Sequence, residues 1–498
     1  MRLSKSRYVT GLQCPKILWM NQHMPEQFDE SVRDKTRLDV GNVVGDLAMG
    51  YYGDFVEVEF DEHGFEAMAE RTRELLDAGE RTICEATFIY QDNFCMADIL
   101  RVEDDGVHIV EAKATDEVKD YHLDDASYQL WVIEQCGLKV KSVGLMHLNK
   151  DYRRKGDINL HELFVVEDIT DEVRSRISSV PQNIQSIAAK TDVEIEPEMR
   201  VGRHCRKPHA CGYQAWCKRE FPTPNVFDIN GIWMSVAADL AYDKGVVTFD
   251  DVAAAELDLN ARQMAQVLCE VNEEDERIDS EAVRGFLEGL RFPLYFLDFE
   301  TFQEAIPPYD DCWPYEQIPS QYSLHVLDEP GGELRHYEFL APEGSDPRRA
   351  VAERLCRDIP MGACSIAYNM SFEKGRISEM AGLFPDLADH LTSINEGMVD
   401  LIEPFKNGFF YRRAMGKSNS IKSVLPALFP DDAELDYHAL EGVHNGGEAM
   451  HAYANLVNLP LEERAAVREQ LLRYCELDTL AMVRIYEKLV EVSKITAK

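Results

Sequence analysis

The sequence predicts an α/β protein with more than one domain, on two observations. The chain has 498 residues, of which 45% are hydrophobic, enough for two or three domains with separate cores. Short apolar runs of strand length alternate with longer segments in which apolar residues recur at helical spacing. We expect a first domain over 1–220, a helical connector over 221–290, and a second domain with a mixed sheet flanked by helices over 291–498.

Charge and cysteine content narrow the function classes. The 90 acidic residues against 52 basic ones argue against coating nucleic acid by bulk electrostatics, so a nucleic-acid groove would have to be locally basic. No apolar run approaches the ~20 residues that cross a bilayer, and the N-terminal segment lacks the apolar core of a signal peptide. We therefore expect a cytoplasmic protein without membrane partners. The 12 cysteines are too few for a disulfide scaffold, so clusters among them indicate metal ligands.

Four of these cysteines stand near the two ends of the first domain. Cys14 precedes a predicted amphipathic helix, and three more follow much later at intervals of six: Cys205, Cys211 and Cys217. Four thiolates can close a four-iron cluster or a tetrahedral zinc site, and either would tie the ends of the domain together. The Cys-x2-Cys knuckles usual in zinc sites are missing, which favours a 4Fe-4S cluster over Zn2+. His204 and His209 are spare ligands.

Carboxylates and a lysine lie between these cysteines. The run Glu-Asp-Asp-Gly at 103–106 predicts a hairpin turn that pairs the strand of Asp98 with the strand of Glu111 and Lys113. The two carboxylates can bind Mg2+ or Mn2+, while Lys113 positions water or stabilises developing negative charge. Glu85, on the preceding strand, is either a further ligand or a surface acid.

This pattern, followed by Ser-Tyr-Gln129-Leu-Trp at the start of a helix and combined with the split cysteines, resembles the RecB-like PD-(D/E)xK nucleases. The CRISPR-associated iron–sulfur members are especially similar, over residues 1–220. The resemblance implies a catalytic role for Gln129 beside Lys113. Gly45 and Ile133 stand where that family commonly has a histidine and a tyrosine. Because the metal-binding core is complete, we expect an active nuclease; the alternative is a domain that keeps the fold for binding alone.

The segment 221–290 carries apolar residues at helical spacing with acids on the other faces, which predicts a helical connector without a metal or phosphate motif. The second domain begins with an apolar run, 294–302, that ends in two carboxylates. Strand periodicity puts Asp298 and Glu300 on one face, where both can reach one Mg2+ or Mn2+ ion. Residues 320–340 then predict a hairpin that extends this sheet.

Partners for these carboxylates occur downstream. Asn369 ends a short apolar run, with Glu373 one helical turn later, and Tyr474 and Asp478 are four apart on a predicted helix. This order resembles the tyrosine branch of the DEDD (DnaQ-like) exonuclease superfamily, over residues 291–498, and implies a ribonuclease-H-like fold.

That resemblance implies removal of nucleotides from a 3′ end by two metals ~4 Å apart. Asp298, Glu300 and Asp478 would be ligands, Glu373 would complete the shell of the second metal, and Tyr474 would orient water. The family usually has aspartate at the position of Glu373, so we expect slightly altered metal geometry. Asp400 is either an outer carboxylate or a helix N-cap.

Basic and aromatic residues suggest where nucleic acid binds. Residues 409–413 interleave aromatics with Arg412 and Arg413, which either contact bases and phosphates or form a buried strand with a polar end. Lys422 is a candidate phosphate contact, and Asn369 a candidate contact to the substrate.

We therefore expect a nuclease with two metal-dependent sites that processes DNA ends, with single-stranded DNA ends as its preferred nucleic-acid partner. Two alternatives remain: an RNA exonuclease, and a nucleic-acid-binding component of a repair or defence complex with one site inactive.

Overall fold

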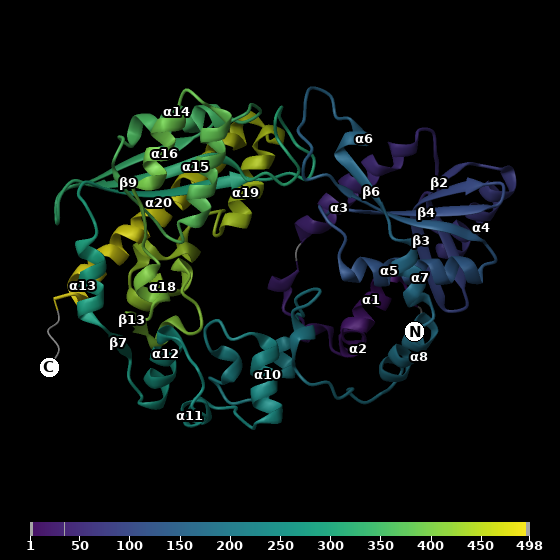
Figure 1. The fold of residues 1–498 in the computed structure, drawn as a ribbon, viewed down its shortest axis with the longest axis horizontal. Helices are drawn as coiled ribbons and strands as arrows, with labels where there is room; N and C mark the ends of the chain where they lie inside the picture. The colour runs from purple at the N-terminus through teal and green to yellow at the C-terminus, as the bar shows by residue number, and fades with distance from the viewer. Residues whose placement is uncertain (1–2, 34, 495–498) are drawn as a thin grey trace. The chain divides into compact units, whose positions relative to one another are not determined.

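A computed structural model describes residues 3–33 and 35–494. The chain forms two compact units, each containing both helices and sheet (Figure 1). The first comprises Met1–Phe221 and Glu304–Tyr315, and the second comprises Pro222–Gln303 and Glu316–Lys498. The α/β class expected from the sequence is confirmed. None of the described helices combines the length and apolar character needed to cross a bilayer.

The first unit contains a six-stranded sheet whose strands lie in chain order. They are β1 (Val56–Glu57), β2 (Thr82–Tyr90), β3 (Asn93–Glu103), β4 (Gly106–Lys113), β5 (Val140–Leu148) and β6 (Phe164–Asp168). The pair β3 and β4 is antiparallel, with Ile99 opposite Val110, as the turn at 103–106 predicts. Strand β5 runs parallel to β4, a pairing that needs a long crossover, and α5 supplies it.

Helices of the first unit are α1 (Lys5–Gln13), α2 (Pro15–His23), α3 (Lys35–Met49), α4 (Phe65–Ala78), α5 (Asp120–Gln135), α6 (Leu160–Leu163), α7 (Thr170–Ile177), α8 (Val180–Thr191) and α9 (Gln214–Cys217). Apolar side chains of α1, α4, α5 and α8 pack with β2 to β5 in one core, in which Tyr128, Leu130 and Ile133 are fully buried. This packing fixes the face of α5 that the sheet covers.

The second unit contains a five-stranded mixed sheet in the order β10-β9-β8-β11-β12. Its strands are β8 (Leu294–Phe302), β9 (Ile318–Leu327), β10 (Leu334–Leu340), β11 (Cys364–Ala367) and β12 (Met398–Asp400). The predicted hairpin of β9 and β10 is confirmed, and β9 pairs antiparallel with β8. Strands β8, β11 and β12 are parallel to one another.

Helices of the second unit are α10 (Met234–Asp243), α11 (Phe249–Ala254), α12 (Ala261–Val271), α13 (Ser280–Glu288), α14 (Arg348–Asp358), α15 (Ser371–Leu383), α16 (Ala388–Glu396), α17 (Glu403–Lys406), α18 (Ile421–Leu428), α19 (Gly446–Asn455) and α20 (Leu461–Val492). Helices α14, α15 and α16 cover one face of the sheet and α20 lies on the other (Figure 1). Phe299 packs in the core under α14 to α16, so its neighbours in β8 point toward α20.

Two segments fall in units that the sequence pattern did not predict. Nearly all of 221–290 lies in the second unit, where β7 (Glu276–Ile278) pairs with β13 (Phe410–Arg412). The segment 304–315, between β8 and β9, belongs to the first unit: the guanidinium of Arg154 donates to the carbonyls of Pro307 and Pro308, and the Tyr315 hydroxyl donates to the carbonyl of Ala114 at 2.8 Å.

Candidate metal centres

Three carboxylates meet between β8 and α20 in the second unit. Asp298, Glu300 and Asp478 each offer an oxygen, and these oxygens lie within 4.8 Å of one another. Strand alternation brings the first two to the α20 side of β8. The long helix supplies the third from a position 178 residues beyond Glu300. The structure thus brings together three of the acids that the sequence names as candidate ligands.

Glu373 adds a fourth carboxylate from the first turn of α15. Its side chain is buried, and its Oε2 atom has no hydrogen-bond partner among the described residues. Asn369, at the turn before α15, has a φ of 67°, a conformation that asparagine tolerates better than most residues. Its backbone N–H donates to Oδ1 of Asp400 at 2.8 Å, so Asp400 holds this turn.

Burial and mutual repulsion raise the pKa values of this group of acids. Burial first, and then the charges of Asp478, Glu373 and Glu300, raise the pKa of Asp298 well above its usual range. Burial raises the pKa of Asp478 to about 6, although the hydrogen bond from Tyr437 lowers it in part. Burial also raises the pKa of Glu373, to about 7. Glu373 and Asp478 are buried, and the other two acids are half-buried. Such carboxylates are costly when no lysine or arginine among the described residues pairs with them, and a divalent ion would remove that cost.

Two tyrosines and a lysine surround the acids. The Tyr437 hydroxyl donates to Oδ1 of Asp478 at 2.5 Å. The ring of Tyr474 lies 6.0 Å from that of Tyr437, and Nζ of Lys422 lies 5.7 Å from both ring centroids. Burial raises the pKa of Glu300 and of Asp478, and the charge of Lys422 offsets part of that rise. Tyr437 was missed in the sequence, because it lies on a short 3-10 turn where no periodicity marks it.

Arg412 and Arg413 interact with acids outside this group. Arg412 pairs with Glu276 across the two-stranded sheet at 2.8 Å, and Arg413 lies 3.8 Å from Glu270. Tyr411 is buried, with the Arg262 guanidinium 4.0 Å from its ring centroid. The structure thus favours the buried strand over a base-stacking surface for residues 409–413, because a buried ring has no face left for a base.

The first unit brings Asp98, Glu111, Lys113 and Gln129 together around the β3–β4 hairpin. Nζ of Lys113 lies 2.7 Å from Oε1 of Glu111, and Nε2 of Gln129 donates to Oε2 of the same carboxylate at 2.7 Å. Oδ2 of Asp98 accepts from the backbone N–H of Ala112 at 2.8 Å. The structure thus brings together the three side chains that the hairpin predicts, and Gln129 joins them from α5.

Two further residues complete this cluster. Nζ of Lys5, on α1, lies 3.0 Å from Oδ1 of Asp98 and 2.7 Å from Oε1 of Glu111. Asp125 Oδ2 lies 2.7 Å from Nζ of Lys113. Asp125 precedes Gln129 by four on α5, a helical spacing that could have identified it. Lys5 comes from a segment distant in sequence, and only the fold brings it here.

The two lysines reverse the effect of burial on one acid of this cluster. Burial alone would raise the pKa of Glu111, but Lys113 and Lys5 lower it to about 2. Burial and the charge of Glu111 raise the pKa of Asp98 to about 6. Burial, and then the negative charge of the nearby Asp98, raise the pKa of Glu85 to about 7. Gly45 and Ile133 are the two positions at which the sequence departs from the family that it resembles. Ile133 is fully buried in the core, whereas Gly45 has open space beside it, because an added Cβ would meet nothing within 4 Å.

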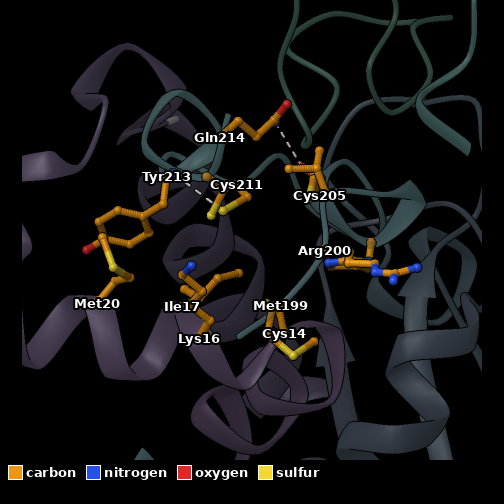
Figure 2. A pocket seen from close by; sticks show the side chains of 13 residues that line it. Cys14, Lys16, Ile17, Met20, Met199, Arg200, Cys205, Cys211, Tyr213 and Gln214 are labelled. Carbon is orange, nitrogen blue, oxygen red and sulfur yellow. Dashed lines mark hydrogen bonds between the residues drawn. The ribbon is translucent and has the colours of Figure 1, made fainter. Parts of the chain in front are cut away.

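The four predicted cysteines line one pocket (Figure 2). Cys14 separates α1 from α2 and Cys217 ends α9, so segments from both ends of the unit meet here. Nε2 of Gln13 donates to the carbonyls of His204 and His209, both at 2.7 Å, which joins these segments beside the thiols.

Apolar side chains surround the thiols. Trp19, Met20 and Tyr213 pack with Cys211 in a small core, and burial raises the pKa of Cys211 to about 12. Burial likewise raises the pKa values of the other three thiols, which no disulfide engages. Four thiols converging on one pocket form a donor set suited to a soft metal centre.

Comparison with known proteins finds similarity over part of the chain. A sequence profile of the family described as "Domain of unknown function (DUF2779)" matches residues 295–420, a range that contains Asp298, Glu300 and Glu373. The "Uncharacterized protein MG366 homolog" of Mycoplasma pneumoniae is 29% identical over 209 residues, which cover 39% of this chain and 31% of that protein.

Two other relatives show the same extent of similarity. "Uncharacterized protein MG366" of Mycoplasma genitalium is 28% identical over 211 residues, covering 39% of this chain and 31% of the relative. "Uncharacterized protein UU173" of Ureaplasma parvum is 26% identical over 239 residues, covering 41% and 33% respectively. The chain thus spans about a third of the length of these curated relatives. No solved structure matches the chain.

Proposed function

We propose that this chain is a metal-dependent nuclease with two active sites that processes DNA ends, and that its C-terminal site hydrolyses phosphodiesters from 3′ to 5′. The observation that carries the proposal is the convergence of Asp298, Glu300 and Asp478 within 4.8 Å. These acids follow the motif order of the tyrosine-branch DEDD exonucleases, and this resemblance supplies the direction of cleavage.

The donor set of the C-terminal site suits Mg2+ or Mn2+. All donors are carboxylate oxygens, which hard cations prefer. Oε2 of Glu373, which has no hydrogen-bond partner within the described part of the chain, offers one more. When bound, such ions supply Lewis-acid stabilisation of the attacking and leaving oxygens of a phosphodiester.

Other side chains of this site fit roles in binding and orientation. The Tyr474 hydroxyl is suited to orienting water, because burial raises its pKa above the ordinary value and keeps it protonated. The Tyr437 hydroxyl fixes the position of the Asp478 carboxylate. Lys422 is the nearby cation that can contact a substrate phosphate, and Asn369 stands at the turn that leads to Glu373.

The N-terminal site is proposed as a second nuclease centre of the RecB-like PD-(D/E)xK type. Asp98 and Glu111 are its metal-binding carboxylates, and Gln129 orients Glu111 by a hydrogen bond of 2.7 Å. Lys113 stands beside them to stabilise negative charge that develops on phosphate. The nearby cysteines are proposed to hold a 4Fe-4S cluster, with Zn2+ as the alternative, and to fasten the two ends of the unit together.

One observation favours a second candidate function, a nucleic-acid-binding component with the N-terminal site inactive. Lys5 and Lys113 already neutralise Asp98 and Glu111, so this cluster is stable as an ion-pair network without any metal. The C-terminal carboxylates have no such lysine at bonding distance among the described residues.

The test is incubation of purified chain with 5′-labelled single-stranded DNA and RNA of the same sequence. We expect a ladder of DNA products shortened from the 3′ end with Mg2+ or Mn2+, none with a chelator, and protection by an inverted 3′-terminal nucleotide. Faster shortening of RNA would support the RNA exonuclease. Binding of DNA without cleavage under every metal condition would support the binding component.

A further inference from the structure

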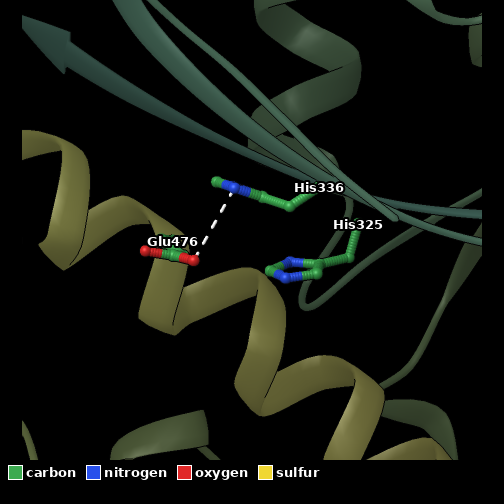
Figure 3. A group of neighbouring side chains, drawn as sticks. All are labelled: His325, His336 and Glu476. Atoms are coloured by element: carbon green, nitrogen blue, oxygen red, sulfur yellow. Dashed lines mark ion pairs between the residues drawn. The ribbon is translucent and has the colours of Figure 1, made fainter. Parts of the chain in front are cut away.

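A second group of metal-binding side chains lies in the second unit, apart from the four carboxylates. His325 on β9, His336 on β10 and Glu476 on α20 each offer a ligand atom, and these atoms lie within 4.8 Å of one another (Figure 3). Glu476 precedes Asp478 by two residues, about 200° around the helix, so the two acids leave α20 in different directions. The imidazoles are stacked with their ring centroids 4.5 Å apart.

Hydroxyl groups behind the imidazoles fix which ring nitrogens face the third side chain. Nδ1 of His325 lies 2.8 Å from Oγ1 of Thr479, and Nε2 of His336 lies 2.9 Å from Oγ of Ser323. The two hydroxyls are 2.7 Å apart, and that of Thr479 also donates to the carbonyl of Glu476 at 3.1 Å. One arrangement of protons satisfies all of these groups. His336 donates to the Ser323 hydroxyl, and the Ser323 hydroxyl donates to the Thr479 hydroxyl. His325 also donates to the Thr479 hydroxyl.

This proton arrangement leaves a lone pair on the other nitrogen of each ring. Nδ1 of His336 then faces Oε1 of Glu476 at 3.6 Å, a lone pair opposite an anion. A metal cation bound between the two groups would interact favourably with both. Metal-bound histidines typically have the same support, with the distant nitrogen held by a hydrogen bond that fixes tautomer and ring orientation.

We propose that His325, His336 and Glu476 form a binding site for Zn2+, independent of the nuclease activity proposed above. Two imidazoles and one carboxylate are a known zinc ligand set that leaves a position for water or a further ligand. His325 is buried, while His336 and Glu476 are partly exposed and give the ion a route in from solvent. The ion would join β9 and β10 to α20, the helix that carries Tyr474 and Asp478.

The test is metal binding by the full chain in millimolar Mg2+, which occupies the oxygen-only sites. Zinc content and titration with Co2+ are compared for the original chain, His336→Ala and Glu476→Gln. We expect each substitution to remove one equivalent of tightly bound zinc and to weaken Co2+ binding at least tenfold. Cobalt here should show visible d–d absorption without sulfur charge-transfer bands, which distinguishes this site from the cysteines.

Matched controls separate this site from surface binding and from misfolding. His63→Ala and Glu469→Gln change an exposed histidine and an exposed acid of α20, and should bind metal as the original chain does. Thr479→Val keeps all three ligands but removes the hydroxyl behind His325, and should weaken binding tenfold to a hundredfold. Equal zinc content and equal Co2+ affinity in the original chain, His336→Ala and Glu476→Gln would overturn the proposal.

Discussion

Nζ of Lys5 lies 2.7 Å from Oε1 of Glu111, a residue 106 positions away in sequence. Lys5→Met keeps an unbranched apolar side chain out to the ε position, but it removes the ammonium group and leaves Asp98 and Glu111 with less compensation for their charges. We expect a loss of several kcal/mol in stability without metal, because a buried ion pair that loses one partner is strongly destabilising. If these carboxylates bind a divalent ion, Mn2+ should restore the melting temperature.

Lys141→Met is the control for this experiment. Lys141 also pairs with two acids, Glu103 and Asp105, but at the exposed end of the hairpin. We expect Mn2+ to raise its melting temperature no more than it raises that of the original chain. If Mn2+ failed to stabilise Lys5→Met, the cluster in the first unit would be an ion-pair network and not a metal site.

The cysteine pocket predicts a coloured protein. Chain purified without oxygen should be brown, absorb at roughly 400 nm and carry about four irons. Cys205→Ala should lower the stability of the first unit as a whole, because the thiolates fasten segments from its two ends. Cys136→Ala, at an exposed cysteine, is the control. A colourless protein with one zinc bound by these thiols would show that the alternative metal occupies the site.

Local sequence patterns predicted the parts of the two sites that lie on a single strand or helix, or on two strands joined by a hairpin. Strand periodicity brought Asp298 and Glu300 to one face, and the turn at 103–106 brought Asp98 to Glu111. Helical spacing placed Tyr474 and Asp478 together on α20. Each inference needed only the geometry of a strand, a hairpin or a helix.

The parts that were missed depend on tertiary packing. Lys5 and Tyr437 reach their carboxylates from an N-terminal helix and a short turn, and no local period marks either residue. No pattern in the sequence marks His325 as a ligand, because its partners His336 and Glu476 come from other elements. The segment 304–315 looks like a loop between two strands of one sheet, although it packs with the first unit.

The raised pKa of Glu373 predicts how stability depends on pH when metal is removed. Its folded-state pKa is about 7 against an ordinary 4.5, so the folded protein binds more protons than the unfolded chain between these values. Stability should therefore fall as the pH rises through this window. Glu373→Gln removes the penalty, and in chelator at about pH 8 it should be more stable by up to about 3 kcal/mol.

Denaturant unfolding of both proteins across the pH range measures this difference, which should vanish below about pH 4.5. Glu379→Gln is the control, because that acid lies on the same helix and pairs with Arg376. It should be no more stable than the original chain. A gain by Glu373→Gln that did not change with pH would mean that folding does not shift the pKa of Glu373.

The two tyrosines beside Asp478 should affect different kinetic quantities. Tyr437→Phe removes the hydrogen bond that fixes a metal-binding carboxylate, so the Mg2+ concentration for half-maximal activity should rise tenfold to a hundredfold. Tyr474→Phe removes a hydroxyl that orients water, so kcat at saturating Mg2+ should fall by about ten- to a hundredfold. Measuring rate against Mg2+ concentration separates them, and identical profiles would contradict the assigned roles.

The most direct test of the C-terminal site is 3′-end trimming of labelled single-stranded DNA by Asp298→Ala, with Lys113→Ala as the matched variant of the other site. Asp298→Ala removes one of the three converging carboxylates, and trimming should fall at least about a thousandfold, or about 4 kcal/mol of transition-state stabilisation. Asp478→Ala should behave in the same way, while Lys113→Ala should trim at the original rate. Full trimming by folded Asp298→Ala, with trimming abolished in Lys113→Ala, would contradict the assignment of the exonuclease to the second unit.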